Sequence, residues 1–447
     1  MHWTHETTRS SFVDMPASNT ASDPAPTPAP TSEPTRHARG SRGYRRVNLA
    51  LFAAGFSTFA MLYATQTLLP ELSARFDLDP ATASLSVSVT TGALALAVIP
   101  VSMVSERWGR SRVMTVSVFA AALLGVLAAF APDFATLVVL RAVQGVALAG
   151  LPATAMAYLA EEVDRPSLGS AMGLYVAGNS IGGMGGRLVT GLASDLGGWR
   201  IALVVVGLLA LGSAIAFRVL LPASRNFTPS TMSAARLTGV LRSHLADPVL
   251  RRLYLLGMIF MAAFGTVYNY LGYRLLAEPF ALPQTVVGAI FVIYLAGTFS
   301  SAASGRLVGR LGHRVTLWTA AAITATGALL TLPDNLALVV VGLIVLTAGF
   351  FAGHSAASSA VGLRAREGRA QASALYLAAY YLGASVGGPV GGVAFHGQGW
   401  TGAVLLVLVL MAAAGVVAAG LSGRPVRSPS PAPARARRPH AHARSAA

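Results

Sequence analysis

Long apolar runs separated by short polar segments dominate this chain. A membrane-spanning helix requires about 20 mostly apolar residues, and twelve stretches meet this requirement. They are 47–69, 83–104, 113–131, 135–159, 169–194, 200–221, 253–275, 284–305, 315–332, 336–358, 370–394 and 400–421. Residues 222–252 form the one long connection and leave six stretches on each side. The pattern predicts an all-α membrane protein with twelve transmembrane helices in two six-helix bundles.

A short basic island follows the second apolar run and returns in the second half of the chain. Residues 106–110 contain an acid, a glycine and two arginines, and they match residues 309–313 after 203 positions (309 − 106). The pair Gly198-Trp199 returns as Gly399-Trp400 after 201 positions (399 − 198). Matching segments in the same order and at nearly constant spacing indicate an internal repeat. We therefore predict two homologous halves of about 200 residues each.

Composition excludes a soluble domain and a disulfide-stabilised one. The chain is 447 residues long, 54% hydrophobic and 11% charged, and it contains no Cys. Soluble domains carry about 25% charged residues. The net charge of +16 raises the question of nucleic acid as a partner. The arginines lie in tails and short loops, where they orient a membrane protein, so we expect a lipid bilayer and no nucleic acid.

The positions of the arginines predict the orientation, because cytoplasmic loops are enriched in Lys and Arg. With a cytoplasmic N-terminus, the inner segments contain Arg36, Arg39, Arg42, Arg45, Arg46, Arg107, Arg110, Arg112, Arg165, Arg225, Arg236, Arg242, Arg251, Arg252, Arg306, Arg310, Arg314, Arg364, Arg366 and Arg369. The outer loops contain only Arg75, Arg200 and Arg274. We expect a multi-pass protein of the cell membrane, plasma or inner, with both termini cytoplasmic.

The domain boundaries follow from these patterns. Residues 1–46 lack a secretory signal and are rich in Pro, Ser, Thr and Ala, so a disordered cytoplasmic tail is expected there. Residues 47–221 and 253–422 are predicted to form the two six-helix bundles, joined by a cytoplasmic central loop at 222–252. Residues 423–447 are rich in Arg and Pro and are expected to form a second disordered cytoplasmic tail.

Together these features resemble the major facilitator superfamily of secondary transporters over roughly residues 47–422. The loop signature of that family, Gly-x-Leu-Ala-Asp-Arg-x-Gly-Arg-Arg, is matched from Ser102 to Arg112, with Glu106 in place of the Asp. The second copy begins at Gly305 and has Gly309 in place of the acid. The residues that match the signature are Glu106, Arg107, Gly109, Arg110 and Arg112, then Gly305, Arg310, Gly312 and Arg314.

Two further family patterns lie in the first half. The fourth-helix pattern Arg-x-x-Gln-Gly appears at Arg141, Gln144 and Gly145. The fifth-helix antiporter pattern Gly-x8-Gly-x3-Gly-Pro-x2-Gly-Gly begins at Gly173, and Arg187 replaces its Pro. Residues 172–187, followed by Gly198-Trp199, are most similar to the YnfM-like, acriflavine-sensitivity subfamily. The resemblance implies alternating access and proton-coupled efflux of small organic molecules.

The resemblance implies roles for these motifs, each with a simpler alternative. The loop signature would latch the two halves while the carrier faces outward, with Glu106 pairing with an arginine and capping a facing helix; alternatively, its charges only set topology. Arg141, with Gln144 on the same helix face, would lie near the proton route; alternatively, Arg141 extends to the outer interface. The buried cation Arg187 could face an anionic substrate group or hold a helix contact.

A substrate cavity is expected between the two halves, lined by aromatic and amide side chains. The residues proposed for it, beside Arg187, are Tyr63, Gln66, Asn179, Tyr268, Asn269, Tyr376 and Tyr380. Each could instead hold neighbouring helices together. His354 lies in the middle of the tenth apolar run and is a possible proton carrier, because imidazole titrates near neutral pH. No acid lies at the centre of any run, so the sequence does not identify the group that carries the proton.

The favoured function is secondary active transport, with proton-coupled efflux of a small organic molecule. The alternatives are uptake or facilitated exchange of a small metabolite, and a receptor or scaffold that has a transporter fold and transports nothing. No nucleophile–base pair, metal-ligand cluster or phosphate-binding loop is present, so no enzyme activity, metal or cofactor is expected. The carrier is expected to work as a monomer, with a small-molecule substrate and protons as its partners.

Overall fold

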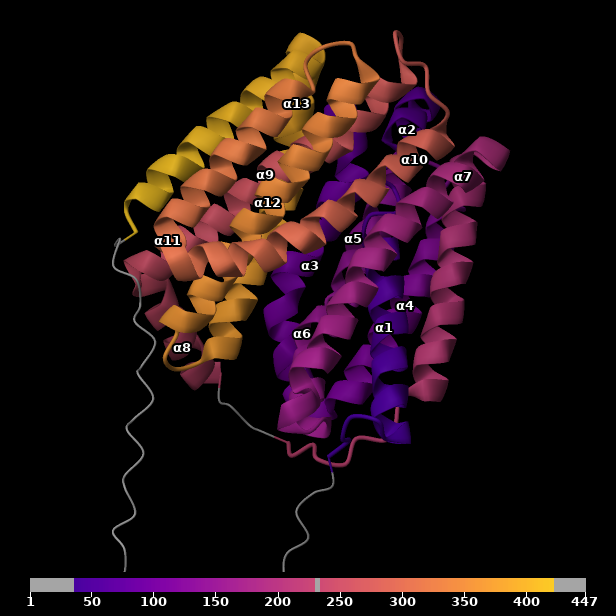
Figure 1. Ribbon diagram of the computed structural model, residues 1–447. Coiled ribbons are helices and arrows are strands. Elements are labelled where there is room, and N and C mark those ends of the chain that lie inside the picture. The colour runs from indigo at the N-terminus through magenta and orange to yellow at the C-terminus, as the bar shows by residue number, and fades with distance from the viewer. Residues whose placement is uncertain (1–35, 230–233, 422–447) are drawn as a thin grey trace, which may run out of the picture. The chain divides into compact units, whose positions relative to one another are not determined.

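The computed structural model describes residues 36–229 and 234–421, which are largely helical (Figure 1). The first half contains α1 (Arg42–Leu62), α2 (Leu69–Phe76), α3 (Pro80–Trp108), α4 (Arg110–Ala128), α5 (Phe134–Leu148), α6 (Gly150–Glu162) and α7 (Arg165–Leu220). The second half contains α9 (Pro248–Leu276), α10 (Gln284–Ile290), the 3-10 helix η1 (Phe291–Ile293), α11 (Tyr294–Leu330), α12 (Leu336–Arg364) and α13 (Arg369–Ala419). Helix α8 (Ala234–Ala246) lies between them in the chain.

Aspartates start four of the long helices. The side chains of Asp79, Asp133, Asp164 and Asp247 each accept a hydrogen bond from a backbone N–H in the first turn of α3, α5, α7 and α9. Such N-caps satisfy donors that have no partner within the helix. Pro80 and Pro248 occupy the first helical positions, where the missing N–H costs nothing. These short Asp-Pro segments therefore define where two of the long helices begin.

The internal repeat is visible in the backbone at four glycines. Gly109 has φ +94°, and its counterpart Gly312, 203 positions later (312 − 109), has φ +79°. Gly198 has φ +77°, and Gly399, 201 positions later (399 − 198), has φ +61°. Residues with side chains rarely adopt positive φ, so glycine is required where the chain turns from one helix into the next. Gly109 and Gly312 thus form the turns of the two loop signatures.

Eight helical stretches of the described chain are long and apolar enough to cross a membrane. Three of these stretches contain a break. Helix α7 is interrupted at Gly197–Gly198, α11 at Gly312 and α13 at Gln398–Gly399. At each break one long helix becomes two consecutive rods. An all-helical membrane protein is therefore what the structure shows.

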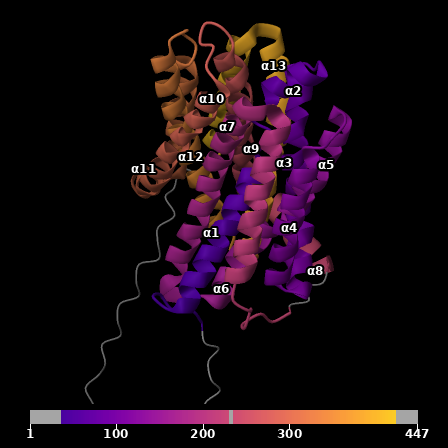
Figure 2. The same cartoon turned by 90° about the vertical axis from the view of Figure 1, so that its right-hand side faces the viewer.

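The helices form two groups that follow the two halves of the chain, visible as the indigo-to-magenta and orange-to-yellow ribbons of Figure 1 and from the side in Figure 2. Within the first half α1 packs along α7, and within the second α9 packs along α13. Contacts between the halves run through α3 with α13 and α7 with α10. We call the end that carries α2 and α10 the α2 end, and the opposite end the α8 end.

Glycines allow helices to approach closely at these contacts. A Cβ added at Gly182 in α7 would lie 2.3 Å from the backbone oxygen of Phe56 in α1. A Cβ at Gly383 in α13 would lie 2.2 Å from the backbone oxygen of Met258 in α9. Small residues at helix contacts are the usual solution in membranes, where no hydrophobic force drives helices together. The glycine-rich segments of the two halves thus serve equivalent contacts.

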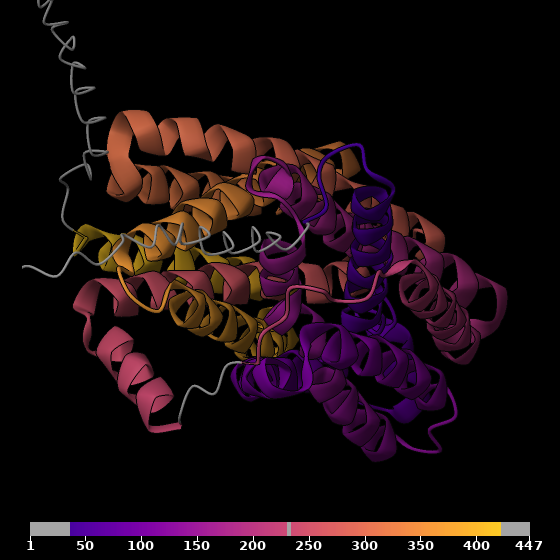
Figure 3. The ribbon, with the colours of Figure 1, turned by 90° about the horizontal axis from the view of Figure 1, so that it is seen from below.

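The structure differs from the sequence-based boundaries in two places. Helix α1 begins at Arg42, and His37 pairs with Val163, so residues 36–46 are ordered rather than part of a disordered tail. Residues 222–252 contain α8 and the start of α9. Helix α8 packs against α9 and α13 of the second half, and it is the rose-coloured helix at the lower left of Figure 3. The apolar runs located the helices, but polar residues extend them at both ends. The expected disordered segments at 1–35 and 423–447 lie outside the described residues.

Candidate functional site

A cavity of about 410 Å³ lies between the two halves. Its walls come from α1, α3, α6 and α7 on one side and from α9, α11, α12 and α13 on the other. Residues proposed from the sequence that line it are Tyr63, Gln66, Asn179, Arg187, Asn269, His354 and Tyr380. Tyr268 and Tyr376 do not line it. Tyr268 bonds Thr347 with a 2.6 Å O–O distance, and Tyr376 bonds His354, so both tyrosines support the wall.

Arg187 is the charged group of this cavity wall, and it is 2% exposed. Its guanidinium carbon lies 4.3 Å from the ring centre of Tyr63 and 4.6 Å from that of Phe291. Its Nε donates to Oε1 of Gln66 at 2.6 Å, and its Nη1 donates to the carbonyl of Gly183 at 2.6 Å. The cation is therefore held by aromatic faces and neutral acceptors rather than by a carboxylate.

Direct polar contacts join the two halves at the α2 end. Gln66 donates from Nε2 to Oδ1 of Asn269 at 2.6 Å, and the hydroxyls of Ser73 and Tyr273 are 2.6 Å apart. The carboxylate of Asp195, at the end of the first rod of α7, accepts from the backbone N–H of Thr285 at 2.8 Å. Gln284 also donates to the carbonyl of Thr67. These contacts hold the two halves together at this end of the cavity.

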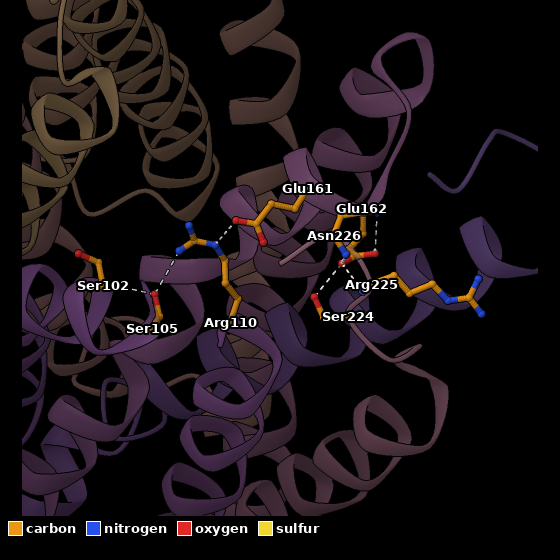
Figure 4. A network of polar contacts seen from close by, with 8 residues as sticks. All are labelled: Ser102, Ser105, Arg110, Glu161, Glu162, Ser224, Arg225 and Asn226. Atoms are coloured by element: carbon orange, nitrogen blue, oxygen red, sulfur yellow. Dashed lines mark hydrogen bonds and ion pairs between the residues drawn. The ribbon is translucent and has the colours of Figure 1, made fainter. Parts of the chain in front are cut away.

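The α8 end has polar contacts within each half, and among the described residues no hydrogen bond connects the halves there. Arg364 pairs with Asp247 at 2.8 Å inside the second half. In the first half Glu162 accepts from the hydroxyl of Ser224 and from the backbone N–H of Arg225 and of Asn226, as Figure 4 shows. The polar bonds between the halves thus lie at one end of the cavity.

The first loop signature forms a different ion pair from the one expected. Arg110 binds Glu161 of α6 at 2.7 Å and Ser105 at 3.2 Å (Figure 4). Glu106 is half-buried and has no hydrogen-bond or ion-pair partner among the described residues. The expected pairing of Glu106 with an arginine is therefore absent from this conformation. The sequence did not indicate Glu161 as the partner of Arg110.

The second loop signature has a turn at Gly312 but no ion pair among the described residues. Arg314 lies over the ring of Trp318, 4.9 Å from its centre, and Arg310 is exposed. A Cβ at Gly305 would meet nothing within 4 Å. The loss of the acid at Gly309 therefore leaves this copy without the local carboxylate that the first copy retains.

Arg141 is 1% exposed, which contradicts the alternative that it extends to the membrane interface. It donates to the carbonyls of Met61 at 2.9 Å, Leu62 at 2.8 Å and Ser86 at 3.0 Å. Its Nη1 also lies 2.5 Å from Oε1 of Gln144. The side chain thus supplies donors where α1 ends, and among the described residues it has no carboxylate partner. Neither Arg141 nor Gln144 lines the cavity.

His354 lies on the cavity wall in α12. Its Nδ1 is 3.0 Å from the hydroxyl of Tyr376, and its ring centre is 4.6 Å from that of Tyr380. Sequence reasoning missed small and aliphatic lining residues and also a set of aromatic ones, namely Phe59, Tyr175, Phe264, Tyr294, Phe350, Phe351 and Tyr381. An aromatic residue in an apolar helix can face lipid, a neighbouring helix or a cavity, and the sequence does not distinguish these three surroundings. The adjacent pair Phe350-Phe351, one turn before His354, is a sequence signal that could have indicated some of them.

Comparison with known proteins identifies the family to which this chain belongs. Residues 51–276 and 253–446 both match the family model described as Major Facilitator Superfamily. The chain belongs to the major facilitator superfamily. It is 44% identical over 390 residues to the uncharacterised MFS-type transporter YybF of Bacillus subtilis (strain 168). The aligned region covers 87% of this chain and 96% of YybF. It is 39% identical over 378 residues to the inner membrane transport protein YnfM of Escherichia coli (strain K12), with 83% and 91% covered.

Solved structures of this superfamily share the fold. A bacterial homologue of the human lysosomal transporter Spinster, in an inward-facing and occupied conformation, has a TM-score of 0.70 and 18% identity, covering 88% of this chain and 100% of that one. The nucleoside transporter NupG has a TM-score of 0.66 and 14% identity, covering 83% and 97%. The predicted superfamily fold and the YnfM-like relationship are thus confirmed, and the protein is a membrane transporter of a family that is not enzymatic.

Proposed function

We propose that this protein exports small organic molecules in exchange for protons, by alternating access of the cavity between its halves. One observation carries the proposal. The cavity is built from both halves, and the polar contacts between the halves lie only at the α2 end of the described chain. Rocking of the halves about the cavity would break these contacts and open that end, as in transporters built from repeats.

Orientation gives the direction of this cycle. With both termini cytoplasmic, as the arginine distribution predicts, the α2 end faces outward and this conformation receives substrate from the cytoplasm. Twelve spans follow when each helix broken at a glycine is counted as two rods and α1 is included. The loop signature then lies on the cytoplasmic side. In the outward-facing state we propose that Glu106, unpartnered here, contacts the second half and acts with Arg110 as the latch. We further propose that one chain is sufficient for transport.

Proton coupling requires a titratable group that the cycle exposes to both sides. Among the residues that line the cavity, His354 is the one whose ordinary pKa lies near neutrality. Its contact with Tyr376 fixes the ring beside Tyr380. We propose His354 as the proton carrier. Arg141 bonds only neutral groups, so its position supports a role in holding α1 and α3 rather than in proton release.

The test uses purified protein in liposomes that contain a pH-sensitive dye. Outward-directed gradients of aromatic acids, aromatic amines and sugars are imposed in turn, and solute and proton fluxes are recorded together. We expect one class to drive proton movement in the opposite direction. His354→Gln should abolish the proton flux and leave substrate binding, whereas Ser359→Ala, five residues further along α12 and outside the cavity lining, should behave as wild type. Solute flux without protons would establish facilitated exchange. No flux for any class would favour the receptor alternative.

A further inference from the structure

Arg187 replaces the proline of the fifth-helix antiporter pattern, and it places a permanent charge in the cavity wall. The side chain is 2% exposed, so most of its hydration is lost. Burial of an ion without a charged partner is energetically costly. A transporter retains such a group where it serves the transport pathway. The surroundings of Arg187 therefore indicate what it binds.

The guanidinium has unused donors. Of its five N–H groups, the Nε proton goes to Gln66 and one Nη1 proton goes to Gly183. Nη2 donates to no residue of the described chain. The residues that line the cavity include no Asp and no Glu, and the other side chain there that can carry a positive charge is His354. The cavity is thus electropositive, with hydrogen-bond donors available at Arg187.

The rest of the wall is mostly apolar and aromatic, with the amides of Gln66, Asn179 and Asn269 and the hydroxyls of Ser180 and Ser358 beside these residues. Phe264 stacks on Phe350, with ring centres 3.9 Å apart, and Phe351 meets Phe264 edge-on. The hydroxyl of Tyr294, whose ring lies 5.2 Å from the carbon of the Arg187 guanidinium, is buried and has no hydrogen-bond partner. A cavity of about 410 Å³ accommodates a molecule of one or two rings.

We propose that Arg187 binds the anionic group of the substrate, and that the substrates are small organic anions, carboxylates or sulfonates, with an aromatic or apolar body. The planar guanidinium fork matches a carboxylate and forms charge-assisted hydrogen bonds with it. The aromatic residues of the second half receive the body. A cationic substrate finds no counter-charge in this cavity. This inference rests on the proposed transport function and adds the substrate class to it.

Direct binding to the purified full-length protein tests the inference without requiring transport. Four probes share one ring system, namely 2-naphthoate, 2-naphthalenesulfonate, 2-naphthamide and 2-naphthylmethylamine, and their affinities are measured by calorimetry at pH 7. We expect both anions to bind at least about tenfold more tightly than the amide and the amine, because only the anions form charge-assisted hydrogen bonds with the guanidinium; a tenfold ratio corresponds to about 1.4 kcal/mol.

Variants separate charge from shape. Arg187→Gln should weaken both anions at least about tenfold and change the amide about twofold at most, while Arg187→Lys should retain part of the preference for anions. Arg200→Gln is the matched control. Arg200 also lies in α7, with its guanidinium carbon 4.3 Å from the ring centre of Trp199, but it is outside the cavity lining. It should bind all four probes as wild type does. Retained binding of the amide shows that a variant is folded.

Three results would overturn the inference: no binding of either anion, equal binding of all four probes, or unchanged anion affinity in Arg187→Gln. The proposed transport function is judged separately in liposomes. Proton-coupled flux of an uncharged aromatic solute, with no preference for anions, would retain export and reject the role of Arg187. Anion binding that depends on Arg187 in a protein that moves no solute would retain the site and reject transport.

Discussion

Gln66 of the first half and Asn269 of the second are joined by a hydrogen bond of 2.6 Å, and the same Gln66 accepts from Arg187 at 2.6 Å. One amide therefore contacts both the buried cation and the opposite half. All three residues line the cavity. Because these bonds share one side chain, the occupancy of the cavity and the closure of the α2 end are physically connected in this structure.

The first prediction concerns the closure of the α2 end by Asp195. Its carboxylate accepts from the N–H groups of Gln284 and Thr285 at the start of α10, in the opposite half. Asp195→Ala removes this cap, which is worth about 1 kcal/mol, and should open the α2 end about fivefold more often. The chain has no Cys, so Thr67→Cys provides a unique label site. Its replacement removes no side-chain hydrogen bond, because the Thr67 hydroxyl has none.

The measurement is the rate at which a maleimide labels this cysteine in liposomes. Thr67 is 2% exposed, so labelling reports opening. Asp195→Asn is the matched control and should label at a rate between those of wild type and Asp195→Ala, since its single amide oxygen replaces only one of the two carboxylate oxygens that accept these bonds. Equal labelling rates in the Ala and Asn variants would show that this cap does not hold the α2 end closed.

The second prediction assigns Arg141 to stability. Arg141→Gln leaves the carbonyls of Met61, Leu62 and Ser86 without this donor in a buried site. Because each unsatisfied buried group costs about 1–3 kcal/mol, we expect the free energy of unfolding to fall by about 3 kcal/mol. Chemical denaturation in detergent measures it. Arg46→Gln is the control, since Arg46 also donates to two carbonyls but is exposed. Similar losses in both variants would argue against a special role for the buried site.

The third prediction compares two glycines of the antiporter pattern within α7. A Cβ at Gly182 would lie 2.3 Å from the Phe56 carbonyl oxygen, whereas a Cβ at Gly173 would meet nothing within 4 Å. Gly182→Ala should therefore lower the free energy of unfolding by about 1–3 kcal/mol. Gly173→Ala should not lower it, because Ala favours helix more than Gly does. Thermal denaturation of both variants in the same detergent tests this, and a smaller loss at position 182 than at 173 would contradict the packing shown here.

The fourth prediction concerns pH and Asp247, which lies outside the membrane-spanning part of α9. Desolvation alone would raise the pKa of this carboxyl, but hydrogen bonds from Arg364 and from the N–H groups of Val249 and Leu250 outweigh it, and the pKa is lowered. A group with a lowered folded-state pKa stabilises the protein above its unfolded-state pKa, about 3.9 for Asp, and the stabilisation is lost as the pH falls through the folded-state value.

Asp247→Asn tests this sign, because Asn retains the cap but not the charge. The melting temperature of the variant should lie below that of wild type at pH 7, and the two values should converge as the pH is lowered from about 3.9 through the lower folded-state pKa. A difference that stays constant from pH 7 to pH 3 would show that the charge of Asp247 contributes nothing. Arg364→Gln should reproduce the loss at pH 7, since it removes the other partner of the pair.

The sequence by itself determined the class of the protein. Apolar runs that are long enough to span a membrane predict helices. In lipid, the backbone N–H and C=O groups of a helix form their hydrogen bonds within the segment itself. The repeat at Gly198 and Gly399 predicted two equivalent halves, and the backbone at these residues confirms it. The loop signature, with its second copy, predicted the superfamily. Each of these signals is local or periodic, and a single sequence contains it in full.

The tertiary structure alone decided which polar groups meet. Gln66 and Asn269 are 203 positions apart (269 − 66), and Arg110 and Glu161 are 51 apart (161 − 110). The hydrophobic pattern states which helix faces are apolar but does not state which neighbour each face contacts. Arg141 and Arg187 illustrate the difference. The sequence places both arginines inside predicted spans. In the structure Arg141 donates to carbonyls at the end of α1, whereas Arg187 lines the cavity. Helix packing across the two halves supplies that distinction.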